Sequence, residues 1–292
     1  MSGFSKSGLL AGMLGVLALG ALPAYAQQAA PDPSAAADSD EPVTDPSTRN
    51  ERDIAKESEN PVGNLTIMPL QNYTNFGFGP HDGTQNILEF EPVVPFHITP
   101  DWNLIARAIL PVVWNPDLSP AHSVPQAFAP TDFSAFFSPS HPVNGITWGV
   151  GPIVQSPTAT SPTVGSSVWG AGPTAVVVYS KGPWVGGGLV DQVWSFGGVN
   201  SGPGGKRYAE LLVQPFINYN FDKGWFVGSA PIITDEESLS GRKWTVPVGA
   251  IGGRLFRVGK LPIKVIAGAY YNVVTPQYGA KWQIISSVFV IF

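Results

Sequence analysis

Apolar and polar residues alternate along most of residues 61–292, which is typical of β-strands with one apolar face. Between residues 209 and 220 every odd position is apolar, whereas polar side chains such as Glu210 and Gln214 lie on even positions. Similar stretches predict twelve strands, at about 64–77, 86–98, 102–114, 131–139, 146–156, 168–180, 184–195, 208–220, 225–234, 244–257, 262–274 and 281–292.

Two kinds of connection separate these strands, and they alternate along the chain. Longer connections are rich in Gly, Pro and Ser, whereas compact turns recur about every forty residues. Propeller blades also repeat at this interval, but a blade holds four short strands rather than two long ones. The pattern therefore indicates consecutive antiparallel hairpins. The compact turns lie at residues 99–102, 140–145, 180–184, 221–225 and 258–262.

An even number of strands with short turns on one side and long loops on the other is typical of bacterial outer-membrane barrels. We predict an all-β fold, an antiparallel up-and-down transmembrane β-barrel of about 12 strands over residues 61–292. Of the nine tryptophans, four follow the short turns and five lie beside the long loops, as in two aromatic belts. A secreted soluble β-sandwich or lectin is the alternative, because its strands alternate in the same way.

Eight prolines fall inside the predicted strands, where each removes a hydrogen-bond donor from the sheet. A closed barrel tolerates this loss because every strand keeps neighbours on both sides. Their similar heights predict either a ring of kinks near the membrane midplane or unrelated local bulges. They are Pro69, Pro95, Pro111, Pro152, Pro173, Pro215, Pro231 and Pro247.

The first sixty residues differ in composition from the rest. Residues 1–26 combine Lys6, an apolar run and a small-x-small ending, which predicts a signal peptide cleaved after Ala26. Residues 27–60 hold nine acidic and three basic residues and no aromatic residue. This composition predicts a disordered acidic periplasmic tail, with one helical turn between Asp53 and Glu59.

Charge and composition narrow the function classes. The formal net charge is −5, but residues 61–292 hold twelve acidic and twelve basic residues, so a basic surface for nucleic acid is not expected. The absence of cysteine excludes disulfides and thiolate metal sites. The four histidines lie in no catalytic motif, so we predict neither an enzyme nor a cofactor or metal site.

Polar residues on the inward side of the strands are the candidates for a functional site. The hairpin around the 99–102 turn predicts that Arg107 and Glu91 lie diagonally across one strand pair. Such charges either form a constriction that selects solutes or form a structural salt bridge in a closed lumen. The predicted lumen residues are Glu89, Glu91, Arg107, Glu210, Gln214 and Asn218.

Both ends of the barrel suggest partners. A terminal aromatic residue, Phe292, on an amphipathic last strand is typical of the signal read by the barrel-assembly machinery. Cations gather at the long-loop end, where they either bind lipopolysaccharide phosphates or mark the rim of the apolar band. We therefore expect outer-membrane lipid, lipopolysaccharide, this machinery and small-molecule solutes as partners. The cations are Lys206, Arg207, Arg242, Lys243 and Lys281.

Five segments carry a resemblance to known proteins: NPVGNLTIMPLQNYTNFGFGP, DWNLIARAILPVV, GPWVGGGLVDQVWSF, QPFINYNFDKGW and RKWTVPVGAIGGRLFRVGKLPI. They resemble a family of Gram-negative exported proteins labelled "transporter" or, misleadingly, "neuromedin U". That family is similar to outer-membrane channels linked to the degradation of phenol and other aromatic compounds. The resemblance implies an outer-membrane location and passive passage of small, hydrophobic or aromatic solutes. A closed structural or surface-interaction barrel is the alternative.

Overall fold

The computed structural model describes residues 49–118, 126–165, 168–196, 208–236 and 243–292. The predicted signal peptide and residues 27–48 of the predicted tail lie outside these ranges. The described residues form β-strands together with one short α-helix, α1 (Glu51–Glu57), and a 3-10 turn, η2 (Asp222–Gly224). Among them, no helix has the length and apolar character needed to cross a membrane.

The strands form one closed antiparallel sheet in which each strand pairs with its neighbours along the chain. Nine strands are continuous: β1 (Ile67–Phe78), β4 (Trp102–Trp114), β7 (Ile146–Ser156), β8 (Gly170–Lys181), β9 (Trp184–Ser195), β10 (Ala209–Asn220), β13 (Trp244–Val258), β14 (Leu261–Val274) and β15 (Trp282–Ile291). Three are broken in two: β2 (Gly83–Phe90) with β3 (Val93–Thr99), β5 (Ala127–Phe128) with β6 (Thr131–Pro139), and β11 (Trp225–Ser229) with β12 (Ile233–Glu236). Each broken pair counts as one strand, which gives twelve strands.

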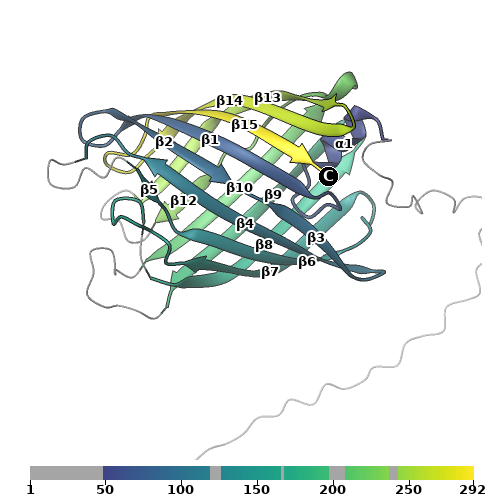
Figure 1. Cartoon of the computed structure of the whole chain (residues 1–292), viewed down its shortest axis with the longest axis horizontal. Helices are drawn as coiled ribbons and strands as arrows, with labels where there is room; N and C mark the ends of the chain where they lie inside the picture. The colour runs from purple at the N-terminus through teal and green to yellow at the C-terminus, as the bar shows by residue number, and fades with distance from the viewer. Residues whose placement is uncertain (1–48, 119–125, 166–167, 197–207, 237–242) are drawn as a thin grey trace, which may run out of the picture. The chain divides into compact units, whose positions relative to one another are not determined.

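The barrel closes where the last strand meets the first. β15 pairs with β1 from Ile67↔Ile291 to Phe76↔Trp282, and Figure 1 shows the yellow β15 beside the purple-blue β1. Because this pair joins the two ends of the sheet, no strand is left with an unpaired edge in the described sheet order. The prediction of a twelve-stranded up-and-down β-barrel is confirmed.

Prolines accompany the interruptions of the sheet. Pro92 and Pro130 lie between the halves of two broken strands, and Pro231 lies between β11 and β12. The register of β13 against β14 shifts next to Pro247. The other six prolines noted in the sequence each keep a register partner in a neighbouring strand, as in the pair Pro152↔Pro173. The interruptions are therefore local features of particular strand pairs rather than a ring formed by the eight prolines.

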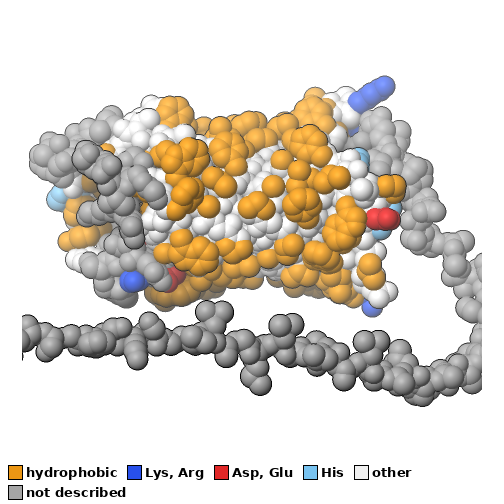
Figure 2. All heavy atoms as spheres, turned by 90° about the horizontal axis from the view of Figure 1, so that it is seen from below, with side chains coloured by type: hydrophobic (Ala, Val, Ile, Leu, Met, Phe, Trp, Pro, Cys, Tyr) orange, Lys and Arg blue, Asp and Glu red, His pale blue; other side chains and the backbone are white. Residues whose placement is uncertain are grey.

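Exposure alternates along the strands because one side of the wall faces the lumen and the other faces outward. Trp184 is 49% exposed, whereas its neighbour Val185 is 1% exposed. Figure 2 shows one outer face of the barrel, where hydrophobic side chains cover the flank and charged side chains lie near the two ends. Eight tryptophans are exposed at the strand ends, four beside the short turns and four beside the long loops: Trp102, Trp148, Trp184, Trp225, Trp169, Trp194, Trp244 and Trp282.

The last part of the predicted tail is ordered. Asn50 caps α1 by accepting a hydrogen bond from Asp53 N at 2.9 Å, and Ile54 and Ala55 are fully buried. Figure 1 places α1 at the short-turn end of the barrel, near the C-terminus. The helical turn expected between Asp53 and Glu59 lies largely within α1. Burial of two apolar side chains against the barrel wall helps to offset the entropy lost on ordering.

Candidate functional site

The lumen contains two regions of different chemistry. We call the first the mouth: the short-turn end of the barrel, occupied by residues 49–66. We call the second the carboxylate cluster: the side chains of Glu89, Glu91, Asp132, Asp191, Glu210 and Glu236 together with Arg107. The first region is largely apolar and contains one buried ion pair, whereas the second contains mostly acidic side chains.

Arg107 is the cation of the carboxylate cluster. It lies on β4 opposite Val93 in β3 and Ser134 in β6. Like the buried Ile105, two positions earlier, it occupies an inward-facing position of the strand. Its Nη2 atom lies 3.9 Å from Oε2 of Glu91, and both side chains are 13% exposed. Three further carboxylates, Glu89, Asp132 and Asp191, interact electrostatically with this guanidinium. The hairpin thus brings Arg107 and Glu91 together as a partly solvated pair.

The remaining carboxylates come from four other strands. Thr174 Oγ1 on β8 donates a hydrogen bond to Asp191 on β9. Asp132 on β6 lies opposite Gln155 on β7, which is also its hydrogen-bond partner. Inward parity therefore brings side chains that are distant in sequence into one region of the lumen.

Glu210 and Glu236 add negative charge toward the long-loop end. They face each other across the pair of β10 and β12, and Glu210 also interacts with Asp132 and Asp191. The cluster contains six carboxyl groups and one arginine, and the carboxyl groups that are ionised favour cations over anions.

Gln214 and Asn218 lie elsewhere in the lumen. Gln214 is opposite Leu189, and Asn218 is opposite Val185. Leu189 and Val185 belong to a buried apolar cluster nearer the mouth. The structure therefore brings together four of the six predicted lumen residues, and it places these two amides beside apolar side chains instead.

A buried tyrosine cluster adjoins the carboxylates. Tyr73 and Tyr270 are buried with Ile285, and three partly buried isoleucines pack against them. Tyr73 interacts electrostatically with Glu89, Glu91 and Arg107. Tyr270 Oη accepts a hydrogen bond at 2.9 Å from the backbone N–H of Ala230, in the break between β11 and β12. Aromatic rings next to negative charge suit a solute with an apolar ring and a cationic or polar group.

The mouth is filled by the N-terminal segment. Val62 packs in one apolar cluster with Ile105, Phe136, Val178 and Val185 from four different strands. On the opposite side, Ile54 and Ala55 of α1 join Leu65, Ile67, Leu255 and Ile291 in a second cluster. The segment therefore contacts the wall on several sides of the short-turn end.

A buried ion pair joins the N-terminal segment to the barrel wall in this region. Lys264 Nζ lies 3.2 Å from Glu59 Oε1, and the two side chains are only 2% and 3% exposed. The ammonium also donates to Ser58 Oγ at 3.3 Å and lies 4.2 Å from the centre of the Phe226 ring. Asn220 Nδ2 donates to the other Glu59 oxygen at 2.9 Å. Both charges are therefore paired and hydrogen-bonded in a site that excludes water.

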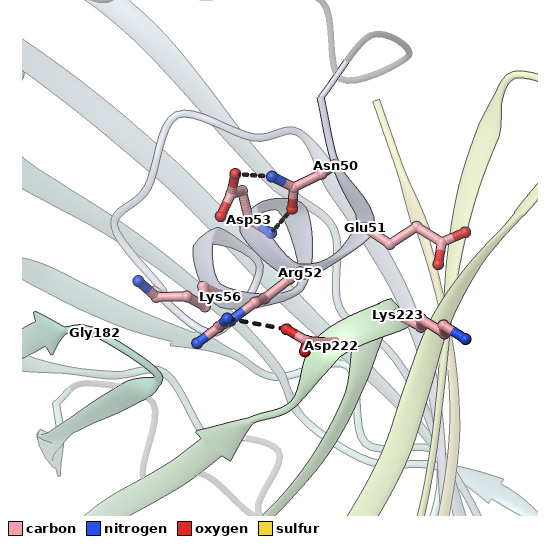
Figure 3. A pocket seen from close by; sticks show the side chains of 8 residues that line it. All are labelled: Asn50, Glu51, Arg52, Asp53, Lys56, Gly182, Asp222 and Lys223. Carbon is pink, nitrogen blue, oxygen red and sulfur yellow. Dashed lines mark hydrogen bonds and ion pairs between the residues drawn. The ribbon is translucent and has the colours of Figure 1, made fainter.

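Two hollows flank the segment at the mouth. One, of about 530 Å³, is lined by polar residues of α1 and by the turn residues Gly182, Asp222 and Lys223. Figure 3 shows Arg52 pointing toward Asp222, to which it donates at 3.1 Å. The second hollow, of about 380 Å³, lies between the segment and the short-turn ends of β6 to β9, with Val62, Thr147 and Val185 in its lining.

Sequence reasoning missed Asp132, Asp191, Glu236 and Lys264 as lumen residues. The alternation of inward and outward positions along the strands could have identified two of them. Asp191 lies on the inward-facing side of β9, together with Val185 and Val193, and Asp132 lies on the inward-facing side of β6, together with Ser134. The inward position of Glu236 does not follow from the pattern of β11, because the break before β12 interrupts the alternation. Lys264 lacks a local signal, since its partner lies 205 residues away.

At the long-loop end, Lys281 pairs with Asp82 at 2.8 Å. Lys206, Arg207 and Arg242 lie outside the described residues, so the predicted basic cluster is described only at Lys243 and Lys281. Within the described ranges, no group of three or more His, Cys, Asp or Glu side chains is arranged to hold a metal ion.

No protein-family model and no curated protein sequence matches this chain. Among solved structures, the chain is similar to an outer membrane channel from Pseudomonas putida F1, with 15% identity, a TM-score of 0.57 and coverage of 78% of this chain and 96% of that one. The chain has the fold of an outer-membrane β-barrel. Weaker similarity links it to a FadL homologue from Pseudomonas aeruginosa (10% identity, TM-score 0.41, 84% and 93% covered) and to the calcium-bound phospholipase dimer of the Salmonella typhi outer membrane (13%, 0.40, 82% and 97%). At these identities the similarity concerns the barrel fold.

Proposed function

We propose that this protein is a Gram-negative outer-membrane channel for passive passage of small solutes. The main support is a closed barrel with an apolar outer surface and with charged and tyrosine side chains in its interior. A soluble sandwich would bury its apolar faces between two sheets, whereas this barrel exposes large apolar side chains around its outside. The Pseudomonas putida protein of the same fold is an outer membrane channel, which supports the proposal by analogy.

The lumen suggests which solutes enter most readily. The carboxylate cluster attracts cations, and the buried rings of Tyr73 and Tyr270 lie beside it. An aromatic or hydrophobic molecule with a positively charged group fits both features. A neutral aromatic molecule fits the tyrosine side chains alone. An aromatic anion of the same size is disfavoured by the carboxylate cluster.

A non-conducting barrel is the second candidate, because residues 49–66 fill the mouth. In that case the Lys264–Glu59 and Arg107–Glu91 pairs serve to fill and fix a closed interior. Reconstituted protein distinguishes the two candidates. A channel conducts ions in planar bilayers, whereas a sealed barrel leaves the membrane resistance unchanged.

The decisive experiment uses liposome swelling with three aromatic solutes of matched size: benzylamine, benzyl alcohol and benzoate. We expect entry to be fastest for the amine and slowest for the carboxylate, and Asp191→Asn should reduce this difference. Protein-free liposomes provide the baseline. Swelling at the baseline rate for all three solutes, combined with zero conductance, would rule out the channel.

The location and partners form part of the same proposal. We expect export by cleavage after Ala26, short turns in the periplasm, and recognition of Phe292 by the barrel-assembly machinery. Phe292 continues the closing pair, since its N–H donates to Thr66 O at 2.8 Å. Lys281 and its neighbours at the long-loop end would then face lipopolysaccharide. No catalytic role is proposed.

A further inference from the structure

Residues 49–64 contact wall residues that face the lumen on many sides of the mouth. Asn103 on β4 donates to Asn64 Oδ1 at 2.8 Å, and Asn220 on β10 donates to Glu59. Lys264 on β14 reaches both Glu59 and Ser58. Together with the apolar clusters around Val62 and Ile54, these contacts place the segment across the opening rather than along one side of it.

Side chains, rather than strand pairing, hold the segment in place. Its backbone-to-backbone hydrogen bonds run within the segment, as from Ser58 N to Ile54 O and from Gly63 N to Asn60 O, whereas wall side chains donate to the carbonyls of Arg49 and Ala55. Pairing with the barrel backbone begins at Thr66, which exchanges two hydrogen bonds with Phe292. A helix of seven residues has little stability of its own, so the segment depends on its contacts with the wall.

These contacts favour release as a unit. Glu59 and Lys264 lose hydration when buried and regain it when the segment leaves, so the pair fixes the position of the segment more than it stabilises it. A hollow of about 380 Å³ lies between the segment and β6 to β9, beside the contacts of Val62 with the wall. The rim pair of Arg52 and Asp222 is exposed and therefore contributes little.

We propose that residues 49–64 form a displaceable plug at the mouth, held by the buried Glu59–Lys264 pair and pivoting where Thr66 joins the barrel wall. Release of the plug opens the short-turn end of the lumen. The consequence for transport rests on the proposed channel function, whereas the release itself does not.

Amide hydrogen exchange of the folded protein in detergent tests the release. In Lys264→Met the carboxylate of Glu59 has lost its partner, so residues 51–63 should exchange at least about ten-fold faster than in the wild type while β8 is unchanged. The double variant Glu59→Met, Lys264→Met replaces the pair with apolar side chains and should restore slow exchange. Lys281→Met, which removes an exposed cation at the other end, is the matched control and should leave residues 51–63 unchanged.

A cross-link tests the opening, because the chain has no cysteine of its own. A Cβ at Gly149 on β7 would lie 2.9 Å from Val62 Cγ1, so Val62→Cys with Gly149→Cys brings two thiols close together. The oxidised form should conduct several-fold less than the reduced form, and reductant should restore the current. The single variants control for the substitutions themselves.

The outcomes separate the two proposals. Exchange in residues 51–63 that matches the barrel strands in every variant would overturn the plug. So would a measurable conductance that is identical in the oxidised and reduced forms. Fast exchange in Lys264→Met, together with zero conductance in every variant, would support release and overturn the channel instead.

Discussion

Two regions of the lumen each contain an ion pair, but in different settings. At the mouth, Lys264 and Glu59 are almost fully buried, 3.2 Å apart and balanced in charge. In the carboxylate cluster, Arg107 and Glu91 are 3.9 Å apart, partly solvated and surrounded by additional carboxylates. A balanced buried pair specifies where a segment docks, whereas an unbalanced solvated group attracts mobile ions. A pair of a basic and an acidic side chain therefore fixes the position of a segment in one region and serves recognition in the other.

The difference also has an energetic side. Removing one partner of the buried pair leaves an unpaired charge in an apolar site, which costs about 3–5 kcal/mol if the segment stays in place. In the carboxylate cluster the side chains of Arg107 and Glu91 are each 13% exposed, and an open channel would supply water to solvate a new charge, so the same kind of change should cost less. Substitutions at the mouth should thus alter structure, and substitutions in the cluster should alter selectivity.

The largest expected effect concerns which end faces the outside of the cell. A cysteine at Gln277, in an exposed long-loop position, should react completely with an impermeant thiol reagent on intact cells. A cysteine at Lys223, in a short turn, should react only after the outer membrane is disrupted. The reverse labelling would put the plugged mouth outside and would invert the proposed orientation.

The next effect tests whether the mouth is held by apolar packing. Ile54→Asp places a carboxylate in a fully buried site, and an uncompensated buried charge costs about 3 kcal/mol or more. Protease cleavage within residues 49–60 should therefore be about 100-fold faster than in the wild type, since each 1.4 kcal/mol is about ten-fold. Arg52→Asp, on the rim, is the control and should change the rate little. Equal cleavage of both variants would show that burial of Ile54 does not hold the segment.

A smaller effect is expected in the carboxylate cluster. Arg107→Glu removes one positive charge and adds a negative one, so the cation-to-anion permeability ratio should rise several-fold in bilayer recordings. An open channel keeps the lumen there hydrated, so under the proposed function the melting temperature should change little. Arg107→Lys keeps the charge and should preserve the ratio. A strongly destabilised Arg107→Glu barrel, with no conductance in the wild type, would indicate a packed lumen and a structural pair.

The smallest effect is expected at the long-loop end. Asp82 raises the pKa of Lys281, so this pair contributes at neutral pH and loses its contribution only when the pH rises through the elevated pKa of Lys281. Because the pair is fully exposed, Lys281→Ala should leave the melting temperature unchanged within error between pH 6 and 9. A clear drop in that range would mean that this pair is more protected than its exposure suggests.

The barrel was predictable from sequence because its determinants are local. A period of two along each strand separates the outward side chains from the inward ones, and turn residues such as Lys223 and Gly224 adopt positive φ. Arg107 and Glu91 could be paired for the same reason, since one hairpin joins them. The strand breaks at Pro92 and Pro130 were missed, because the sequence alone does not show which prolines interrupt pairing and which are tolerated within it.

The plug was not predictable because its determinants are not local. Within α1, Ile54 and Ala55 are the buried apolar residues, too few for a clear amphipathic pattern. Their partners Leu255 and Ile291 lie on the last strands, and Lys264 looks like an ordinary charged strand residue until its partner is known. Likewise, Asp191 on β9 joins Arg107 on β4 only after the wall closes.

The long separation between Glu59 and Lys264 also has a consequence for the order of folding. The segment can find its ion partner only after a further 205 residues have been placed, and its apolar partner Ile291 belongs to the strand that closes the sheet. Contacts that are this distant in sequence form late, because loop closure must precede them. The mouth therefore stays open during assembly, and occupation of the mouth by residues 49–64 marks a barrel whose last seam has formed.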